Sequence, residues 1–295
     1  MSPAPHKSFR LRFALTVLLA LLCILPAAVL RAAPDSPAPS VTELPSSIGT
    51  IIYQQHPDSP CQLYIVANSH RSCATGANGT ETVSAQIETF RIGEWLIKRQ
   101  HLDFLLPEGF FGHDRSGKRP LRDAKRMDGR TLEERLADTS TFVNAELLLH
   151  RHYRIGLYQV EDRALYNRAR ALLRSGLEGD AILSPGFGDD LAYLQERRLA
   201  AILQNVPSAL TVAGRQEGIT APKAMLTIGL AHLPDLVRYL EAGNISITAA
   251  PGGESLFPPF HARLTLDRKD VGVTIIVPRS LLANCKLAQL AAPTH

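Results

Sequence analysis

The stretch LTIGLAHLPDLVRYLEAG, residues 226–243, changes from strand to helix character within a few positions. Its first part continues the apolar run MLTIG, which is typical of a buried strand. The second part carries apolar residues at helical spacing: Leu233, Leu236, Val237 and Leu240. Gly229 lets the chain turn after the strand, and His232 stands where the helix begins. The stretch therefore predicts a strand, an imidazole at the junction, and a helix.

Predicted strands and helices alternate along most of the chain. Short apolar segments predict strands at 49–55, 61–67, 102–106, 155–160, 225–229, 245–249 and 271–277. Helical spacing predicts helices at 81–98, within 131–152, and at 163–175, 188–206 and 233–242. This alternation indicates an α/β fold with a mixed, largely parallel sheet flanked by helices. We expect a single domain over residues 49–290.

Capping residues and prolines indicate where several predicted helices begin and end. Thr131 followed by Glu134 fits a capping box, so a helix should begin there. Pro207 should end the helix that begins at residue 188, because proline cannot donate a helical hydrogen bond. Residues 110–130 are charged and aperiodic, which indicates a long irregular connection.

The overall composition limits the classes of function. The chain has 295 residues, of which 45% are hydrophobic and 20% charged, enough for one domain with a sizeable core. Its formal net charge is +4, and several basic residues lie in the first 12 positions. No basic stretch alternates with aromatic residues, so nucleic-acid binding is not expected.

The N-terminus has the pattern of a secretory signal peptide over residues 1–33. A basic segment precedes the apolar run 13–30, and small, turn-prone residues follow it. Residues 34–48 are rich in Pro and Ser and are predicted to be a linker. We expect an exported protein, periplasmic or extracellular. The alternative is membrane attachment through an uncleaved anchor at 13–30, since that run barely reaches spanning length.

Three cysteines remain after the predicted signal peptide: Cys61, Cys73 and Cys285. An odd number allows at most one internal disulfide and leaves one thiol. Their spacing matches no zinc motif. The sequence does not choose among the three pairings, of which Cys61–Cys73 is one.

Polar residues whose side chains can bind a metal or take part in catalysis follow four of the predicted strands. In largely parallel sheets, ligands bind at the carboxyl ends of the strands. The residues found there are His70, Glu108, Glu161, Asp162 and His232. Two imidazoles and one or two carboxylates suit a divalent transition metal. If the strands are parallel neighbours, all five residues lie on one rim of the sheet, where a shared metal site is one interpretation.

Each of these residues also has a purely structural interpretation. A histidine that opens a helix, such as His232, is often a turn residue, and Glu108 can complement a helix N-terminus. Asp162 is better explained as the N-cap of the helix that follows. His150 and His152 lie at a predicted helix end, where solvated histidines are expected.

Glu196 lies on the apolar side of its predicted helix. It precedes Leu199 by three residues and Leu203 by seven, so it shares their face. A carboxylate on a buried face must be paired or belong to a site. We expect it to pair with an arginine, with a role in a site as the alternative.

The order of these short segments resembles a known group of proteins. IGLAHLPDLVRYLEAG resembles the second GxxH motif of the TraB/PrgY/GumN/Tiki group of the erythromycin-esterase and ChaN-like superfamily. VANSH falls where the first GxxH motif would lie, LLPEG where a strand-ending glutamate lies, and LQERRLAAIL resembles the Glu-Arg-rich helix. The four segments occur in the same order over roughly residues 49–250.

The resemblance implies an α/β fold with a metal-dependent hydrolase or protease site. The group's two histidines and its glutamate would map onto His70, His232 and Glu108, with Glu108 either a third metal ligand or the base that activates a bound water. Glu196 and Arg197 would carry the helix motif as catalytic residues. The sequence departs from the group at Ala67, which replaces the glycine of the first motif. It departs again at Asn68, where the esterase-like branch has glutamate.

Three hypotheses follow for the function. The first is an exported metal-dependent hydrolase, peptidase or esterase-like, that acts on a small-molecule or peptide substrate with a divalent metal ion. The second is a non-catalytic protein of the same fold that binds a small molecule or haem. The third is a scaffold with no site, which holds if the rim residues diverge. The departures at Ala67 and Asn68 argue against catalysis of the esterase type and leave open a member that binds a ligand without turning it over.

Overall fold

The computed structural model describes residues 41–69, 79–114, 130–178, 186–248, 257–266 and 270–285. The chain divides into two units, residues 1–38 and 39–295. The first unit, with the predicted signal peptide, lies outside the described residues, so all that follows concerns the second. No helix within the described ranges is long and apolar enough to cross a membrane.

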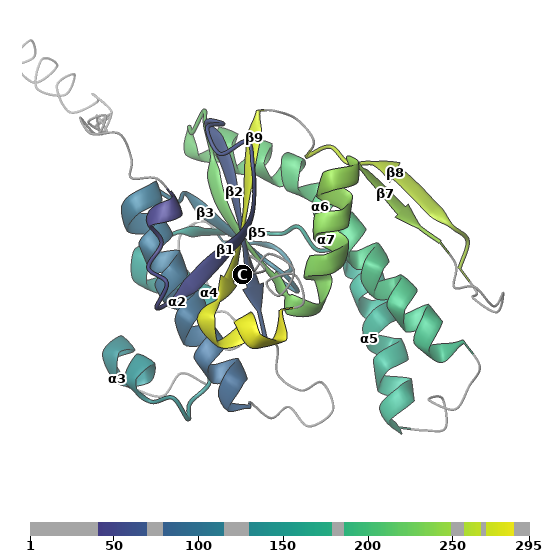
Figure 1. Ribbon diagram of the computed structural model, residues 1–295, viewed down its shortest axis with the longest axis horizontal. Helices are drawn as coiled ribbons and strands as arrows, with labels where there is room; N and C mark the ends of the chain where they lie inside the picture. The colour runs from purple at the N-terminus through teal and green to yellow at the C-terminus, as the bar shows by residue number, and fades with distance from the viewer. Residues whose placement is uncertain are drawn as a thin grey trace, which may run out of the picture. The chain divides into compact units, whose positions relative to one another are not determined.

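A seven-stranded sheet forms the centre of the fold, in the order β1-β9-β2-β6-β3-β5-β4 (Figure 1). Its strands are β1 (Gly49–Gln55), β2 (Cys61–Asn68), β3 (Phe104–Pro107), β4 (His113–Asp114), β5 (Gly156–Tyr158), β6 (Lys223–Gly229) and β9 (Val271–Pro278). The five inner strands are parallel, and the edge strands β1 and β4 are antiparallel to their neighbours. The predicted mixed, largely parallel sheet is confirmed.

Helices cover both faces of this sheet. They are α2 (Thr80–Gln100), α3 (Leu132–Ala137), α4 (Ala145–Tyr153), α5 (Arg163–Glu178), α6 (Phe187–Glu217) and α7 (Leu233–Ala242). Short 3-10 turns are η1 (Val41–Glu43), η4 (Leu230–His232) and η5 (Arg279–Asn284). In Figure 1, α2 and α4 lie on one side of the sheet, and α6 and α7 lie on the other. Thr131 and Glu134 form the predicted capping box at the start of α3.

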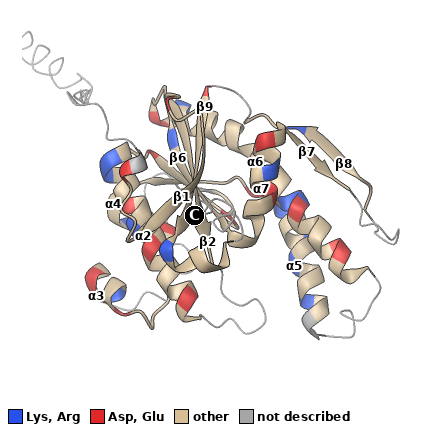
Figure 2. Ribbon diagram, in the orientation of Figure 1, with Lys and Arg blue, Asp and Glu red and all other residues tan. Residues whose placement is uncertain are grey.

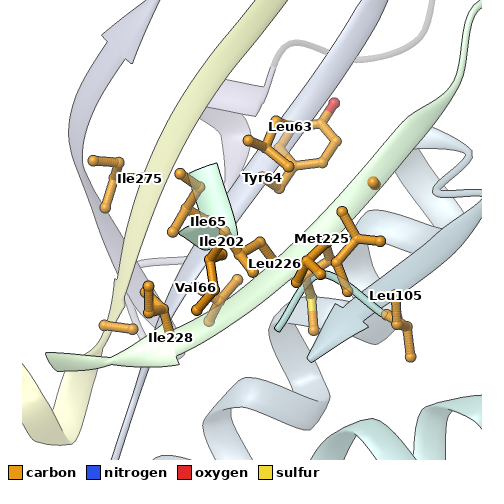
Figure 3. Close-up of a cluster of buried hydrophobic side chains, with 14 of the residues drawn as sticks. Leu63, Tyr64, Ile65, Val66, Leu105, Ile202, Met225, Leu226, Ile228 and Ile275 are labelled. Carbon is orange, nitrogen blue, oxygen red and sulfur yellow. The ribbon is translucent and has the colours of Figure 1, made fainter. Parts of the chain in front are cut away.

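The central strands are largely apolar because helices bury both of their faces. In β2, every residue from Gln62 to Asn68 is buried, and six of the seven residues of β6 are buried. Figure 3 shows side chains from β2 and β6 meeting Ile275 of β9 and Ile202 of α6. This core explains why these segments are continuous apolar runs rather than alternating patterns.

The prediction that the helix from residue 188 ends before Pro207 is wrong. Helix α6 continues through Pro207 to Glu217. Proline in a helix interior removes one hydrogen bond and costs about 3 kcal/mol. Apolar residues are buried on both sides of it, including Val206, Leu210 and Ala213. The burial of this second half outweighs the local break, so the helix persists.

The predicted strands are found, but strands that follow one another in the chain are often not neighbours in the sheet. The last strand, β9, lies between β1 and β2. The segment predicted at 245–249 becomes β7 (Asn244–Ile247), which pairs with β8 (Phe260–Arg263) in a separate two-stranded sheet. Strand β8 falls in a Pro- and Gly-rich stretch where no strand was expected. Local patterns identify strands, but contacts distant in sequence choose their partners.

The predicted linker at 34–48 also contributes to the packed unit at its end. Val41, Leu44 and Ile48 are partly buried against the hydrophobic core. The Leu44 amide donates to the Val41 carbonyl, and the Ile48 amide donates to the Pro45 carbonyl. These apolar residues every three or four positions favour packing, although Pro and Ser dominate the segment's composition.

Candidate functional site

The carboxyl ends of β2, β6 and β3 lie side by side. Asn68 at the end of β2 pairs with Gly229 at the end of β6, and Pro107 at the end of β3 pairs with Thr227. The residue after Pro107 is Glu108, whose backbone amide donates to the Thr227 carbonyl. This register places Glu108 beside the turn that carries His232.

Both oxygens of the Glu108 carboxylate accept hydrogen bonds. The Gly229 amide donates to Oε2 at 2.7 Å, and Nη2 of Arg198 donates to Oε1 at 3.0 Å. The side chain of Glu108 is only 8% exposed. Hydrogen bonds from a backbone amide and a guanidinium fix the carboxylate in one orientation at the rim of the sheet.

His232 approaches the same carboxylate from η4. Its Nε2 atom lies 3.7 Å from Oε1 of Glu108, beyond hydrogen-bond distance but close enough for both atoms to contact one small ligand. The imidazole is more exposed than the carboxylate, at 14% against 8%. Gly229 has φ −56° and ψ 136°, a conformation open to any residue. The backbone angles at this turn therefore do not require glycine, and the Gly229 amide contributes by donating to Glu108.

Arg198 joins Glu108 to a second buried carboxylate, Glu161. Nη2 of Arg198 donates to Oε2 of Glu161 at 2.8 Å, and Nε donates to Oε1 at 3.3 Å. The side chain of Glu161 is fully buried, and the Gly109 amide also donates to it. Burial raises the pKa of Glu161, against the lowering effect of its hydrogen bonds and of the Arg198 charge. We call Glu108, Glu161, Arg198 and His232 the charged cluster.

Aromatic rings lie beside the charged cluster. The Arg198 guanidinium lies over the ring of Tyr166, with its carbon 5.0 Å from the ring centroid. Phe111 packs edge-on against Tyr166, with the ring centroids 5.0 Å apart, and Arg163 lies over the Phe111 ring at 4.8 Å. These residues come from α5 and from the segment after β3, so they border the cluster on the α6 side of the sheet.

A second buried polar group lies at the same strand ends, on the α2 and α4 side. The Asn68 amide nitrogen donates to Oε1 of Glu146 at 3.2 Å, and the Gln86 amide nitrogen donates to Oδ1 of Asn68 at 2.6 Å. The Gln86 carbonyl oxygen accepts from the Ala145 amide at 3.0 Å. We call Asn68, Gln86 and Glu146 the amide cluster. It ties the end of β2 to α2 and to the first turn of α4.

The structure does not bring Glu196 and Arg197 into contact with Glu108. Glu196 accepts hydrogen bonds from Arg238 and Tyr239 of α7, so the expectation of pairing with an arginine is confirmed. Arg197 lies over the ring of Phe260, 3.4 Å from its centroid. The next residue, Arg198, is the one that reaches the carboxylates. It lies four residues from Leu194 and four from Ile202, both of which are buried. That spacing places Arg198 on the buried face of the helix, and it is the signal by which the sequence could have identified this residue.

Other sequence predictions have mixed outcomes. Asp162 caps α5, accepting from the amides of Ala164 and Leu165, as its structural interpretation predicts. His150 is not solvated, because it is fully buried and its Nδ1 lies 2.6 Å from the Ile155 carbonyl oxygen. His70 lies outside the described residues, so its expected place beside Glu108 stays a prediction.

The described residues do not form a complete metal site. Within those ranges no group of three or more His, Cys, Asp or Glu side chains could hold a metal ion. The pair of Glu108 and His232 fits two ligands of one ion, since ligand bonds of about 2 Å allow donor atoms this far apart. Cys61 and Cys285 are not joined to each other, and Cys73 is outside the described residues.

Comparisons with known proteins add no identification: no family model, no curated protein and no solved structure matches the chain. The resemblance to the TraB/PrgY/GumN/Tiki group therefore rests on the quoted motifs alone.

Proposed function

We propose that the protein is an exported hydrolase whose reacting groups are Glu108 and His232. One observation carries the proposal. The Glu108 carboxylate is held by the Gly229 amide and by Arg198, and its Oε1 stands 3.7 Å from the imidazole Nε2 of His232. A fixed carboxylate and an adjacent imidazole at a strand-end rim are the groups that general acid–base catalysis requires.

In this proposal Glu108 is the base that activates water. The water attacks a carbonyl carbon of the substrate, its proton passes to Glu108, and the same proton then goes to the leaving amine or alcohol as that bond breaks. His232 is less buried than Glu108, and in this proposal it is the group that meets the substrate. Arg198 is a positioning residue, because it orients Glu108 and is itself held by Glu161.

A divalent metal ion is part of the proposal. It would be held by His232 and by His70, with Oε1 of Glu108 within reach as a further ligand. That oxygen has a second lone pair beside the one that accepts from Arg198. When bound, the ion would polarise the carbonyl and lower the pKa of a bound water.

The test compares Glu108→Gln with His232→Ala in purified full-length protein, measured by elemental analysis and by turnover of ester and peptide panels. We expect wild type to hold one divalent ion and His232→Ala to lose it. Glu108→Gln should reduce turnover by about 10²–10⁴-fold, the effect of losing a general base. Glu94→Gln, a carboxylate of α2 bonded to Lys98, is the matched control and should leave both readings unchanged.

The metal content of Glu108→Gln separates the two possible roles of Glu108. If Glu108 is only a base, the variant keeps the metal ion, and if Glu108 is a ligand, the variant loses it. A wild-type protein that holds no divalent metal contradicts the metal-dependent form of the proposal. Ligand binding without any turnover, together with unchanged behaviour of Glu108→Gln, would support the alternative of a non-catalytic binding protein.

A further inference from the structure

The guanidinium of Arg198 is held along its edge by three side chains. Its Nε and Nη2 atoms donate to Glu161, Nη2 also donates to Glu108, and Nη1 donates to Oε1 of Gln195 at 2.6 Å. The N–H groups of a guanidinium all lie in its plane. These hydrogen bonds therefore fix the edge of the group, whereas its tilt depends on what lies over its flat faces.

Tyr166 of α5 lies over one of these faces. The ring centroid is 5.0 Å from the guanidinium carbon of Arg198, and the arginine side chain is only 8% exposed. Helices α5 and α6, which carry the two residues, pack against each other and lie side by side in Figure 2, where their basic residues are blue. A cation that is shielded from water gains more from an aromatic ring than an exposed one does. The ring therefore holds the guanidinium in a plane that meets Glu108.

The same ring contacts the residue that follows Glu108. A methyl group placed on Gly109 would lie 3.7 Å from Cε2 of Tyr166, which is ordinary van der Waals contact. The Gly109 amide donates to Oε2 of Glu161, and Phe111 packs edge-on against Tyr166. Gly109 has φ +73°, in the left-handed region that favours glycine. Tyr166 thus touches both the chain beside Glu108 and the arginine that holds its carboxylate.

We propose that Tyr166 is a positioning residue for Glu108. The proposal rests on the proposed function, because it gives Tyr166 a part in the reaction assigned to Glu108. The ring keeps Nη2 of Arg198 on Oε1 of Glu108, while the Gly229 amide holds Oε2. A displacement of about 1 Å in a reacting group can cost about 10²-fold in rate. Loosening of Arg198 should therefore appear in the chemical step.

The first measurement is steady-state hydrolysis of ester and peptide panels by purified full-length protein. Tyr166→Leu should lower kcat by about tenfold or more and leave KM unchanged, because Glu108 acts in the chemical step. Tyr166→Phe keeps the ring over Arg198 and should retain the wild-type kcat. The matched control is Tyr193→Leu, which removes a tyrosine of α6 that stacks on Phe257 with the ring centroids 4.9 Å apart. It should keep the wild-type kcat even where it unfolds at lower urea concentration.

The second measurement needs no turnover and follows the Nε–H group of Arg198 by NMR. This group donates to the buried carboxylate of Glu161, so its proton should exchange slowly with water, and its signal is assigned by its absence in Arg198→Lys. Tyr166→Leu should speed this exchange by about tenfold or more, because the guanidinium gains freedom to tilt. Tyr166→Phe and Tyr193→Leu should leave the exchange rate unchanged.

Equal loss of kcat in Tyr166→Leu and Tyr193→Leu would overturn the proposal, because it would reflect a general loss of stability. A raised KM at constant kcat would also overturn it, since Tyr166 would then act in substrate binding. Unchanged exchange of the Arg198 proton in Tyr166→Leu overturns it whatever the activity. If wild type shows no turnover but this exchange is faster only in Tyr166→Leu, the hold of Tyr166 on Arg198 stands and the proposed hydrolase does not.

Discussion

Two buried polar clusters lie at the same strand ends, on opposite sides of the sheet, and they are built differently. The charged cluster, on the α6 side, joins two carboxylates through one guanidinium, with His232 at its exposed margin. In the amide cluster, on the α2 and α4 side, Gln86 donates to Asn68, and Asn68 donates to the Glu146 carboxylate. Amides complete a hydrogen-bond network without a cation, whereas the charged cluster depends on Arg198.

This difference suggests separate tasks for the two sides of the rim. The amide cluster fixes the end of β2 against α2 and α4, which is a structural task. The charged cluster holds Glu108 beside a partly exposed imidazole, which is the arrangement that chemistry can use. We therefore expect the two clusters to respond very differently to the loss of one member.

The largest expected effect comes from removing the cation of the charged cluster. Arg198→Met leaves Glu108 and Glu161 buried without their shared partner and should lower the free energy of unfolding by about 3–5 kcal/mol. Urea denaturation measures this change. Arg197→Met, the control next to it, loses only the contact with Phe260 and should cost about 0.5–1 kcal/mol. Similar losses in the two variants would mean that the charged cluster does not depend on its guanidinium.

A smaller effect is expected in the amide cluster. Gln86→Met keeps the side-chain volume but leaves the Ala145 amide and Oδ1 of Asn68 without their partner, which should cost about 1–3 kcal/mol. Glu146→Gln keeps an acceptor for Asn68 and should cost less than Gln86→Met. If Glu146→Gln proves the more damaging of the two in urea denaturation, the amide cluster also depends on charge, and the contrast between the clusters fails.

The smallest effect concerns pH and is specific to Glu161. Since burial raises its pKa in the folded state, the folded protein binds a proton there before the unfolded chain does. This contribution to stability is complete below the unfolded pKa of about 4.3 and is lost as pH rises through the folded pKa. The stability of wild type relative to Glu161→Gln should therefore fall as pH rises through that window, by about 1.4 kcal/mol for each unit of pKa shift.

Glu94 is the control for this pH dependence, because its pKa is lowered in the folded state, whereas that of Glu161 is raised. Burial acts to raise its pKa, but hydrogen bonds from Lys98 and Tyr153 outweigh burial and lower it. Its contribution should be present above the unfolded pKa and lost as pH falls through the folded one. Parallel pH curves for wild type and Glu161→Gln would show that Glu161 titrates alike in both states.

The sequence alone determined the class of fold and much of its order. Continuous apolar runs identified β2, β6 and β9 because helices bury both faces of those strands. Helical spacing gave α7 with the bounds observed, and the capping residues Thr131 and Asp162 marked the starts of two helices. The positions of Glu108 and His232 after two predicted strands also indicated that they lie close together, since the carboxyl ends of parallel strands share one edge. In the structure their side chains approach to 3.7 Å.

Only the tertiary structure decided which partners these residues have. The placement of β9 between β1 and β2, the continuation of α6 beyond Pro207, and the use of Arg198 instead of Arg197 all depend on contacts distant in sequence. A local pattern gives the periodicity of a segment, but it does not contain the position of the surface that buries it. On α6, one residue is a rotation of about 100° around the helix. That rotation separates an arginine stacked on Phe260 from one buried between two carboxylates.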